Sequence, residues 1–151
     1  MCIIVDINIA TDVLFPAPIG ADEFEPIREA FGKGTAKLVC GGKLRDEYDK
    51  SAKVRRQFLV LERAGRARII SKESLDDTEL RNIDRFAKCK SNDKHILALA
   101  ICSGARLLCT NDGNLINDFR NKDIIEPRGN VYKYKKHKPL IARHCTRLRI
   151  R

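Results

Sequence analysis

The 151-residue chain has no tryptophan, a single methionine, and no apolar run near the roughly 20 residues that a membrane-spanning helix needs. It contains no CxxC or HxxxH pair, which argues against a structural zinc site. It also lacks a GxxxxGK[ST] segment, which excludes a P-loop nucleotide site. The first residues, Met1 to Asp6, show neither the basic region nor the long apolar stretch of a secretory leader. We therefore expect a soluble, cytoplasmic protein.

The cysteines also lack the spacing of a disulfide framework. The six are scattered along the chain, and several stand inside apolar runs such as Leu38-Val39-Cys40. This placement predicts buried, reduced thiols. Since neither the cysteines nor the three histidines form a ligand pair, any bound metal is expected to have oxygen ligands.

Acidic residues are absent after Glu126, and this absence makes the C-terminal segment strongly basic. Nine lysine and arginine residues follow: Arg128, Lys133, Lys135, Lys136, Lys138, Arg143, Arg147, Arg149 and Arg151. Such a block either contacts phosphate or serves as a solvated tail that keeps the protein in solution. We accordingly divide the chain into a domain over residues 1–126 and a basic segment over 127–151 that packs on the domain or extends from it.

Short apolar runs alternate with longer segments of helical spacing. Five runs are expected to be strands: Cys2–Val5, Lys37–Cys40, Ala67–Ile70, Ala105–Cys109 and Asp123–Ile125. Fully apolar strands alternating with helices indicate a mainly parallel sheet covered on both faces. The predicted fold class is therefore α/β, a three-layer α/β/α sandwich with about five strands.

Two helices are expected from their apolar stripes, one over Asp93–Cys102 and a longer one over about Leu44–Arg63. Prolines and glycines between Phe15 and Gly34 predict a loop with at most a short helix near Phe24–Phe31. Residues that select a substrate usually lie on loops. Phe15–Gly34 and Arg128–Lys138 are thus the candidates for substrate choice.

Three acids are predicted to meet at one edge of the sheet. Asp6 follows the first strand, Asp112 follows the strand ending at Cys109, and Asp93 opens the crossover helix leading to that strand. The carboxyl ends of parallel strands are where ligand crevices form. Each acid also has an ordinary interpretation: Asp6 as a helix cap, Asp93 as an acid of a first helical turn, and Asp112 as part of an Asn-Asp-Gly turn.

Glu47 adds a fourth acid from a separate helix. It shares the apolar face of the predicted Leu44–Arg63 helix, where a lone carboxylate is costly unless something pairs with it. A bound cation would do so. The alternative is a glutamate at the edge of the stripe that reaches water. Four acids from separate segments that face one crevice favour a shared function.

These residues resemble the successive motifs of the PIN-domain nucleases. The resemblance rests on Val5-Asp6-Ile7-Asn8, Glu47, Asn92-Asp93 before Ile96-Leu97-Ala98-Leu99-Ala100, and Leu108-Cys109-Thr110-Asn111-Asp112, and it covers Met1 to about Ile125. It implies a PIN-like fold, four site acids at Asp6, Glu47, Asp93 and Asp112, and a polar assistant at Asn8. Two positions depart from the family pattern. Ile7 stands where Thr or Ser is frequent, and Asn114 replaces a further acid, for which Asp118 is a possible substitute one turn later.

The expected activity follows from the carboxylates. Clustered acids with no nearby His or Cys pair select Mg²⁺ or Mn²⁺, which activates a water that attacks phosphorus. We expect a metal-dependent endoribonuclease acting on single-stranded RNA. Its small size is similar to that of the toxins of toxin–antitoxin pairs, which would imply an antitoxin partner, while a role in RNA processing stays open. A homodimer is a further expectation. The alternative is a catalytically inactive, PIN-like nucleic-acid-binding or assembly domain.

The basic segment carries two tyrosines among its lysines. In an extended chain Tyr132 and Tyr134 would share one face and Lys133 and Lys135 the other, with Lys136 following. Such a segment could stack bases and contact phosphates, so we list these five residues as candidates for RNA binding. The alternative is an edge strand whose tyrosines pack on the core.

Overall fold

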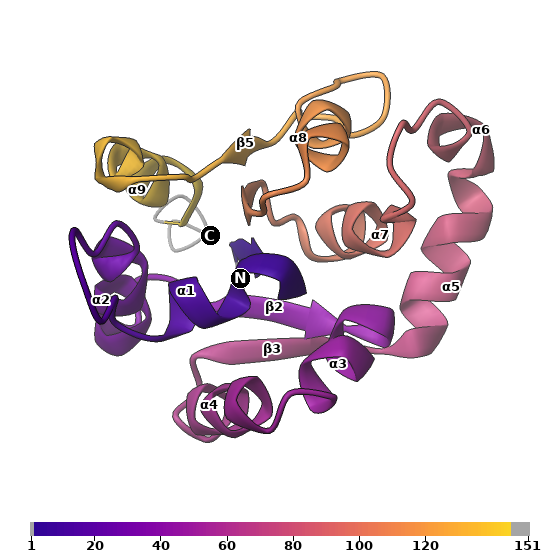
Figure 1. The fold of residues 1–151 in the computed structure, drawn as a ribbon. Coiled ribbons are helices and arrows are strands. Elements are labelled where there is room, and N and C mark those ends of the chain that lie inside the picture. The colour runs from indigo at the N-terminus through magenta and orange to yellow at the C-terminus, as the bar shows by residue number, and fades with distance from the viewer. Residues whose placement is uncertain (1, 146–151) are drawn as a thin grey trace.

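A computed structural model describes residues 2–145 of the chain. Its centre is one sheet of five parallel strands in the order β3-β2-β1-β4-β5 (Figure 1). The strands are β1 (Ile3–Val5), β2 (Leu38–Gly41), β3 (Ala67–Ile70), β4 (Leu107–Cys109) and β5 (Asn130–Val131). The three central strands are wholly buried, because apolar side chains on both faces are covered by helices.

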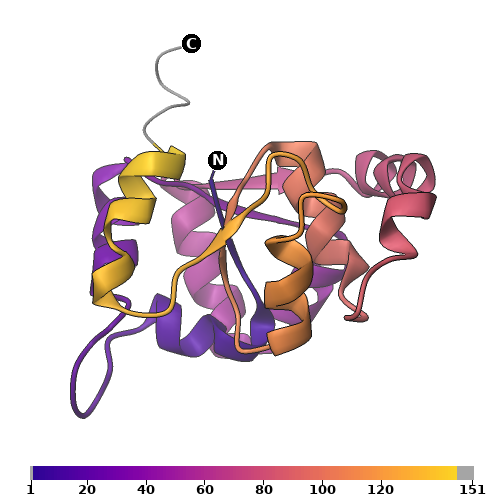
Figure 2. The ribbon, with the colours of Figure 1, turned by 90° about the horizontal axis from the view of Figure 1, so that it is seen from above.

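Helices cover both faces of this sheet and confirm the expected α/β/α sandwich. Figures 1 and 2 show α2 and α9 on one side of the sheet and α7 and α8 on the other. Among the helices of residues 2–145, none has the length and apolar composition of a membrane-spanning segment. In chain order the helices are η1 (Ile7–Ile9), α1 (Ala10–Leu14), α2 (Glu25–Lys33), α3 (Gly42–Asp49), α4 (Ala52–Arg63), α5 (Lys72–Arg81), α6 (Ile83–Phe86), α7 (Lys94–Ser103), α8 (Gly113–Phe119), η2 (Lys135–His137) and α9 (Pro139–Cys145).

The predicted helix over Leu44–Arg63 is in fact two helices. The backbone of Ser51 is extended, and its side chain accepts a hydrogen bond from the Val54 amide at 3.3 Å. This is a helix N-cap, so α3 ends and α4 begins in a new direction. The apolar stripe continues across the break, which is why its spacing suggested one helix.

The prediction of a strand at Asp123–Ile125 is wrong. Ile124 and Ile125 lie in a turn in which their amides both donate to the Asn121 carbonyl at 3.0 Å. Both side chains are nevertheless buried in the core, so the apolar run reflects burial without a strand. The fifth strand is β5, which pairs with β4 through Leu107 and Leu108.

The expectation that all six cysteines are reduced is also wrong. Cys2, just before β1, forms a disulfide with Cys145 at the end of α9, with Cα atoms 5.2 Å apart. The two residues are 143 positions apart, and only the fold brings the start of the central strand beside the last helix. Cys40 and Cys109 are buried free thiols, as predicted, whereas Cys89 and Cys102 are free but only partly buried. The disulfide joins the basic segment to the sheet.

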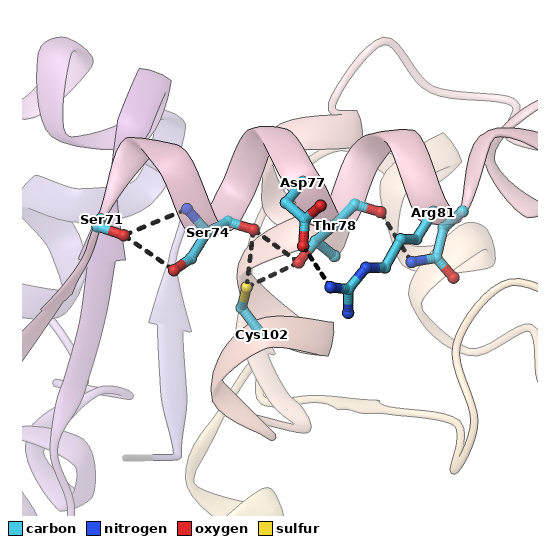
Figure 3. A network of polar contacts seen from close by, with 7 residues as sticks. Ser71, Ser74, Asp77, Thr78, Arg81 and Cys102 are labelled. Atoms are coloured by element: carbon cyan, nitrogen blue, oxygen red, sulfur yellow. Dashed lines mark hydrogen bonds and ion pairs between the residues drawn. The ribbon is translucent and has the colours of Figure 1, made fainter.

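A polar network packs α5 onto α7, the helix that follows Asp93 (Figure 3). Thr78 Oγ1 donates to the Ser74 carbonyl at 2.8 Å and contacts Cys102 Sγ, at the end of α7. Cys102 Sγ also donates to the Ser74 carbonyl. Ser71 caps the start of α5, and an Asp77–Arg81 ion pair lies on its outer side. These contacts hold α5 and α7 together.

Candidate functional site: a carboxylate cluster at the sheet edge

The candidate site lies where β1 and β4 end side by side. Val5 pairs with Cys109, and the Asp6 amide donates to the Cys109 carbonyl at 2.9 Å. The next residue after β4 is Thr110, whose hydroxyl donates to Asp6 Oδ2 at 2.7 Å. The chain runs from β1 to β2 on one side and returns through β4 on the other. This is a topological switch point, the place where open α/β sheets form ligand crevices.

Asp6 does not act as a helix cap. It precedes η1, yet its side chain makes no capping hydrogen bond. The residue is only 5% exposed, and Thr110 is buried beside it. Burying a carboxylate costs free energy, and a capping role does not explain why Asp6 is buried. The ordinary interpretation of Asp6 is therefore not supported by its contacts.

Asp112 has two roles at once. Its Oδ1 accepts hydrogen bonds from the Asn114 and Leu115 amides at 2.9 and 3.3 Å, so it caps α8, whereas the alternative interpretation expected an ordinary turn. Its carboxylate also lies within hydrogen-bonding reach of Asp93. A capping bond thus fixes the orientation of one acid of the cluster.

Asp93 reveals how close the four acids are. It stands just before α7 and makes no side-chain capping bond there. Burial raises its pKa to about 6, assisted by the contact with the Asp112 carboxylate and by the negative charges of Asp6, Asp112 and Glu47. The charges of Asp6, Glu47 and Asp112 therefore all act on Asp93, although the four acids come from separate segments.

Glu47 reaches this neighbourhood from α3, and two contacts hold it there. Its neighbour Tyr48 is buried and donates its hydroxyl to the Val5 carbonyl, which fixes α3 against the end of β1. The Glu47 side chain is 27% exposed, and its Oε1 lies 3.2 Å from His95 Nε2. Burial lowers the pKa of His95, while the charge of Glu47 opposes that shift.

His95 was not identified from the sequence as a site residue. Its position two residues after Asp93, on the first turn of the following helix, was the available signal. The apolar surroundings of Glu47 predict a bound cation as its partner, whereas the structure places the His95 imidazole beside its carboxylate. His95 is therefore a positioning residue for Glu47.

Asn8 and Thr110 support the acids without adding charge. Asn8 Oδ1 accepts a hydrogen bond from the Asn111 amide at 3.2 Å, and its amide nitrogen lies 3.5 Å from Thr110 Oγ1. Thr110 Oγ1 also accepts from the Asp112 amide at 3.1 Å. Asn8 is thus an assistant of the loop after β4, and Thr110 links Asp6 to Asp112. No role had been assigned to Thr110 from the sequence.

Asp118 is not a substitute fifth acid of the cluster. It is buried, and its carboxylate accepts hydrogen bonds from the Lys90 and Ser91 amides, with its shortest contacts at 2.9 Å. These bonds hold the loop that leads to Asp93. Asp118 therefore helps to position Asp93, because its oxygens accept hydrogen bonds from the backbone of the preceding loop.

The five candidates for RNA binding are arranged differently from the prediction. Tyr132 is fully buried, its ring 5.7 Å from that of Phe24 and its hydroxyl donating to the Glu23 carbonyl at 2.8 Å, so it cannot stack on a base. The chain then turns into η2 and is not extended. Lys133, Lys135 and Lys136 are exposed there. Arg147, Arg149 and Arg151 lie outside the described residues.

Tyr134 keeps an accessible ring next to these lysines. It is 40% exposed and stacks on His137, with ring centroids 4.6 Å apart. Lys136 Nζ lies 4.8 Å from the centre of the same ring. One tyrosine of the predicted pair is therefore placed to meet a ligand, and the other belongs to the core.

The chemistry of the cluster fits a hard divalent cation. Its donors are carboxylate oxygens, which Mg²⁺ and Mn²⁺ prefer, and positive charge would offset the repulsion that acts on Asp93. Among residues 2–145, however, no three His, Cys, Asp or Glu side chains stand ready to hold a metal ion. Binding would require these side chains to close in around the ion.

Comparisons with known proteins leave the function to be inferred from this geometry. No protein-family model matches the chain, and no curated protein sequence matches it.

Proposed function

We propose that this protein is a cytoplasmic, PIN-like endoribonuclease that hydrolyses phosphodiester bonds of single-stranded RNA with Mg²⁺ or Mn²⁺. One observation carries the proposal. Asp6, Glu47, Asp93 and Asp112 come from four separate segments, and the pKa of Asp93 is raised to about 6, first by burial and then by the Asp112 contact and the negative charges of the other three acids. Such repulsion destabilises a protein unless it serves a ligand.

The residues have distinct tasks in this reaction. Asp6 and Asp112 are oriented by Thr110 and by the α8 amides, which suits them to be direct ligands of the ion. Glu47 and Asp93 serve as further ligands or orient the attacking water. When bound, the ion would lower the pKa of that water and stabilise charge on the phosphoryl oxygens. No side-chain nucleophile is required.

Cleavage in the presence and absence of chelator tests the proposal. We expect a fluorescently labelled single-stranded RNA to be cut in Mg²⁺ or Mn²⁺ and to stay intact in excess EDTA, because the acids repel the phosphate unless a cation is bound. Gel electrophoresis of the products measures this. Undiminished cleavage in EDTA by a preparation free of contaminating nucleases would contradict the mechanism.

A nuclease with an acidic site also needs positive charge nearby to hold its substrate. The lysines of η2, together with Tyr134, follow β5 and so leave the sheet at the same edge as Asp6 and Thr110. This common edge supports a path for RNA from the carboxylates to η2.

Replacing Lys133, Lys135 and Lys136 together with alanine is expected to weaken RNA binding and to flatten its salt dependence. Each lost phosphate contact should reduce the slope of log K against log salt by about 0.7 for a single strand. Fluorescence anisotropy across a salt series in EDTA measures the slope. Lys72, Lys88 and Lys122 provide a control triple variant of equal charge loss. An unchanged slope in the η2 variant would assign its lysines to solubility.

The alternative is a catalytically inactive PIN-like domain that binds nucleic acid or supports assembly. The contact of Glu47 with His95 favours it, because an imidazole already partners one of the four acids. An inactive domain would bind RNA equally well with and without divalent ions and would never cleave it. Within the nuclease proposal, a toxin with an antitoxin partner and an RNA-processing enzyme are both compatible with the site, as is a homodimer.

A further inference from the structure

A cavity of about 450 Å³ lies between α1, the loop over residues 15–24 and the start of α4. Residues that give it its chemical character are Thr11, Asp12, Phe15, Ile19, Glu23 and Lys53. No role in the carboxylate cluster accounts for it. Its volume is sufficient for one nucleobase and too small for a folded partner.

Arg28 of α2 holds the wall of this cavity in place. Its guanidinium donates to the Val13 and Phe15 carbonyls at 2.9 and 3.0 Å and forms an ion pair with Asp22. These bonds join both ends of the loop to one rigid helix. The loop is therefore preorganised, and ordering it would not reduce the affinity for a ligand.

The walls of the cavity are connected both to the segment that carries Asp6 and to the basic η2 segment. On one side, α1 follows Asp6 and η1 directly. On the other, the Glu23 carboxylate accepts a hydrogen bond from the Lys135 amide at 3.2 Å, and its carbonyl accepts from Tyr132. In Figure 2 the loop between α1 and α2 projects at the same end of the molecule as α1. A strand of RNA that runs from the site to η2 would pass over it.

The lining residues favour the base of a nucleotide over its phosphate. Three lining carboxylates, Asp12, Asp22 and Glu23, disfavour a phosphate. Asp22 is already paired with Arg28, which leaves Asp12 and Glu23 to accept hydrogen bonds from amino groups. The ring of Phe15 and the exposed Ile19 provide apolar surface for a flat base. Lys53 Nζ lies over the Phe15 ring, 4.4 Å from its centre, and its charge would attract a phosphate next to the base.

We propose that this cavity binds one unpaired nucleobase that carries an exocyclic amino group. The base is adenine, cytosine or guanine, and Asp12 or Glu23 accepts a hydrogen bond from its amino group. Uracil, which has carbonyl oxygens at the corresponding edge, is disfavoured. The inference rests on the proposed function only in taking RNA as the substrate. If so, the loop over residues 15–24 selects which base is accepted next to the cleaved bond.

Binding of short homopolymers in EDTA tests this without any catalytic step. We expect the wild-type protein to bind oligo(A) and oligo(C) about tenfold more tightly than oligo(U), as one hydrogen bond to a charged acceptor would produce. Ala21→Trp places an indole at the cavity wall and should abolish this preference. Ala64→Trp, the same change at the exposed end of α4, should leave it intact. Thermal melting shows whether each variant is folded.

Asp12→Asn is the second variant, because it keeps the size of the side chain and replaces one acceptor oxygen with a donor. It should reduce the preference for oligo(A) and oligo(C) severalfold while oligo(U) binding changes little. Equal affinity of the wild-type protein for all three oligomers, or a preference that survives Ala21→Trp, would overturn the inference. Either result would leave the proposed nuclease activity intact, since cleavage in Mn²⁺ is measured separately on the same proteins.

Discussion

Asp6→Asn is expected to reduce RNA cleavage by about a thousandfold or more, the effect of losing several kcal/mol of metal-assisted stabilisation of the transition state. The substitution keeps the shape of the side chain, so Thr110 can still donate to its remaining oxygen. It removes one of several like charges that crowd the site. The folded protein without metal should therefore be as stable as the wild type or more so.

Asp112→Asn should also abolish cleavage. The stability of this variant has to be considered separately, because Asp112 also caps α8. Asparagine caps helices nearly as well as aspartate, so only a small loss is expected. Asp46→Asn, on the exposed side of α3, is the matched control and should leave activity unchanged. Thermal melting without metal, alongside initial cleavage rates, distinguishes the two roles. If Asp6→Asn unfolds the protein, Asp6 is structural and the site assignment is wrong.

The sheet and the edge on which the acids meet could be predicted from the sequence because both follow from local patterns. Apolar runs such as Ile3–Val5 mark buried parallel strands, and the residue after each run lies at the carboxyl edge. Asp6 and Thr110 then become neighbours through the pairing of β1 with β4. Glu47 could be found from helical phase, even though the helix on which it was placed ends sooner than expected.

The rest depends on contacts between distant segments, which a local pattern does not encode. The disulfide between Cys2 and Cys145 needs α9 to return to the start of β1. The contact of His95 with Glu47 needs α3 and α7 to be adjacent. Tyr132 and Tyr134 looked equivalent in sequence, but packing against Phe24 buries one and the turn into η2 exposes the other. In each case the outcome depends on a residue that is distant in the sequence and close only in the folded protein.

The pH dependence of stability is expected to report on Asp93. Its pKa is raised from the ordinary 3.8 to about 6, first by burial and then by the neighbouring acids. Between these values the folded protein without metal holds a proton that the unfolded chain has lost. The contribution of Asp93 to stability is therefore fully present below about pH 4 and is lost as the pH rises through 6. With solvent screening of this partly exposed group, the loss should be about 1 kcal/mol.

A divalent cation should reverse this loss, because it competes with the proton for the same oxygens. Melting curves in EDTA are expected to fall from about pH 4.5 to about pH 7, whereas Mn²⁺ should raise the melting temperature more at about pH 7 than at about pH 5. Asp93→Asn should flatten the first trend and weaken the second. Asp84→Asn, an exposed acid of α6, is the control and should keep both. Equal slopes in the wild type and Asp93→Asn would show that Asp93 does not share the crowded charge from which a metal site is inferred.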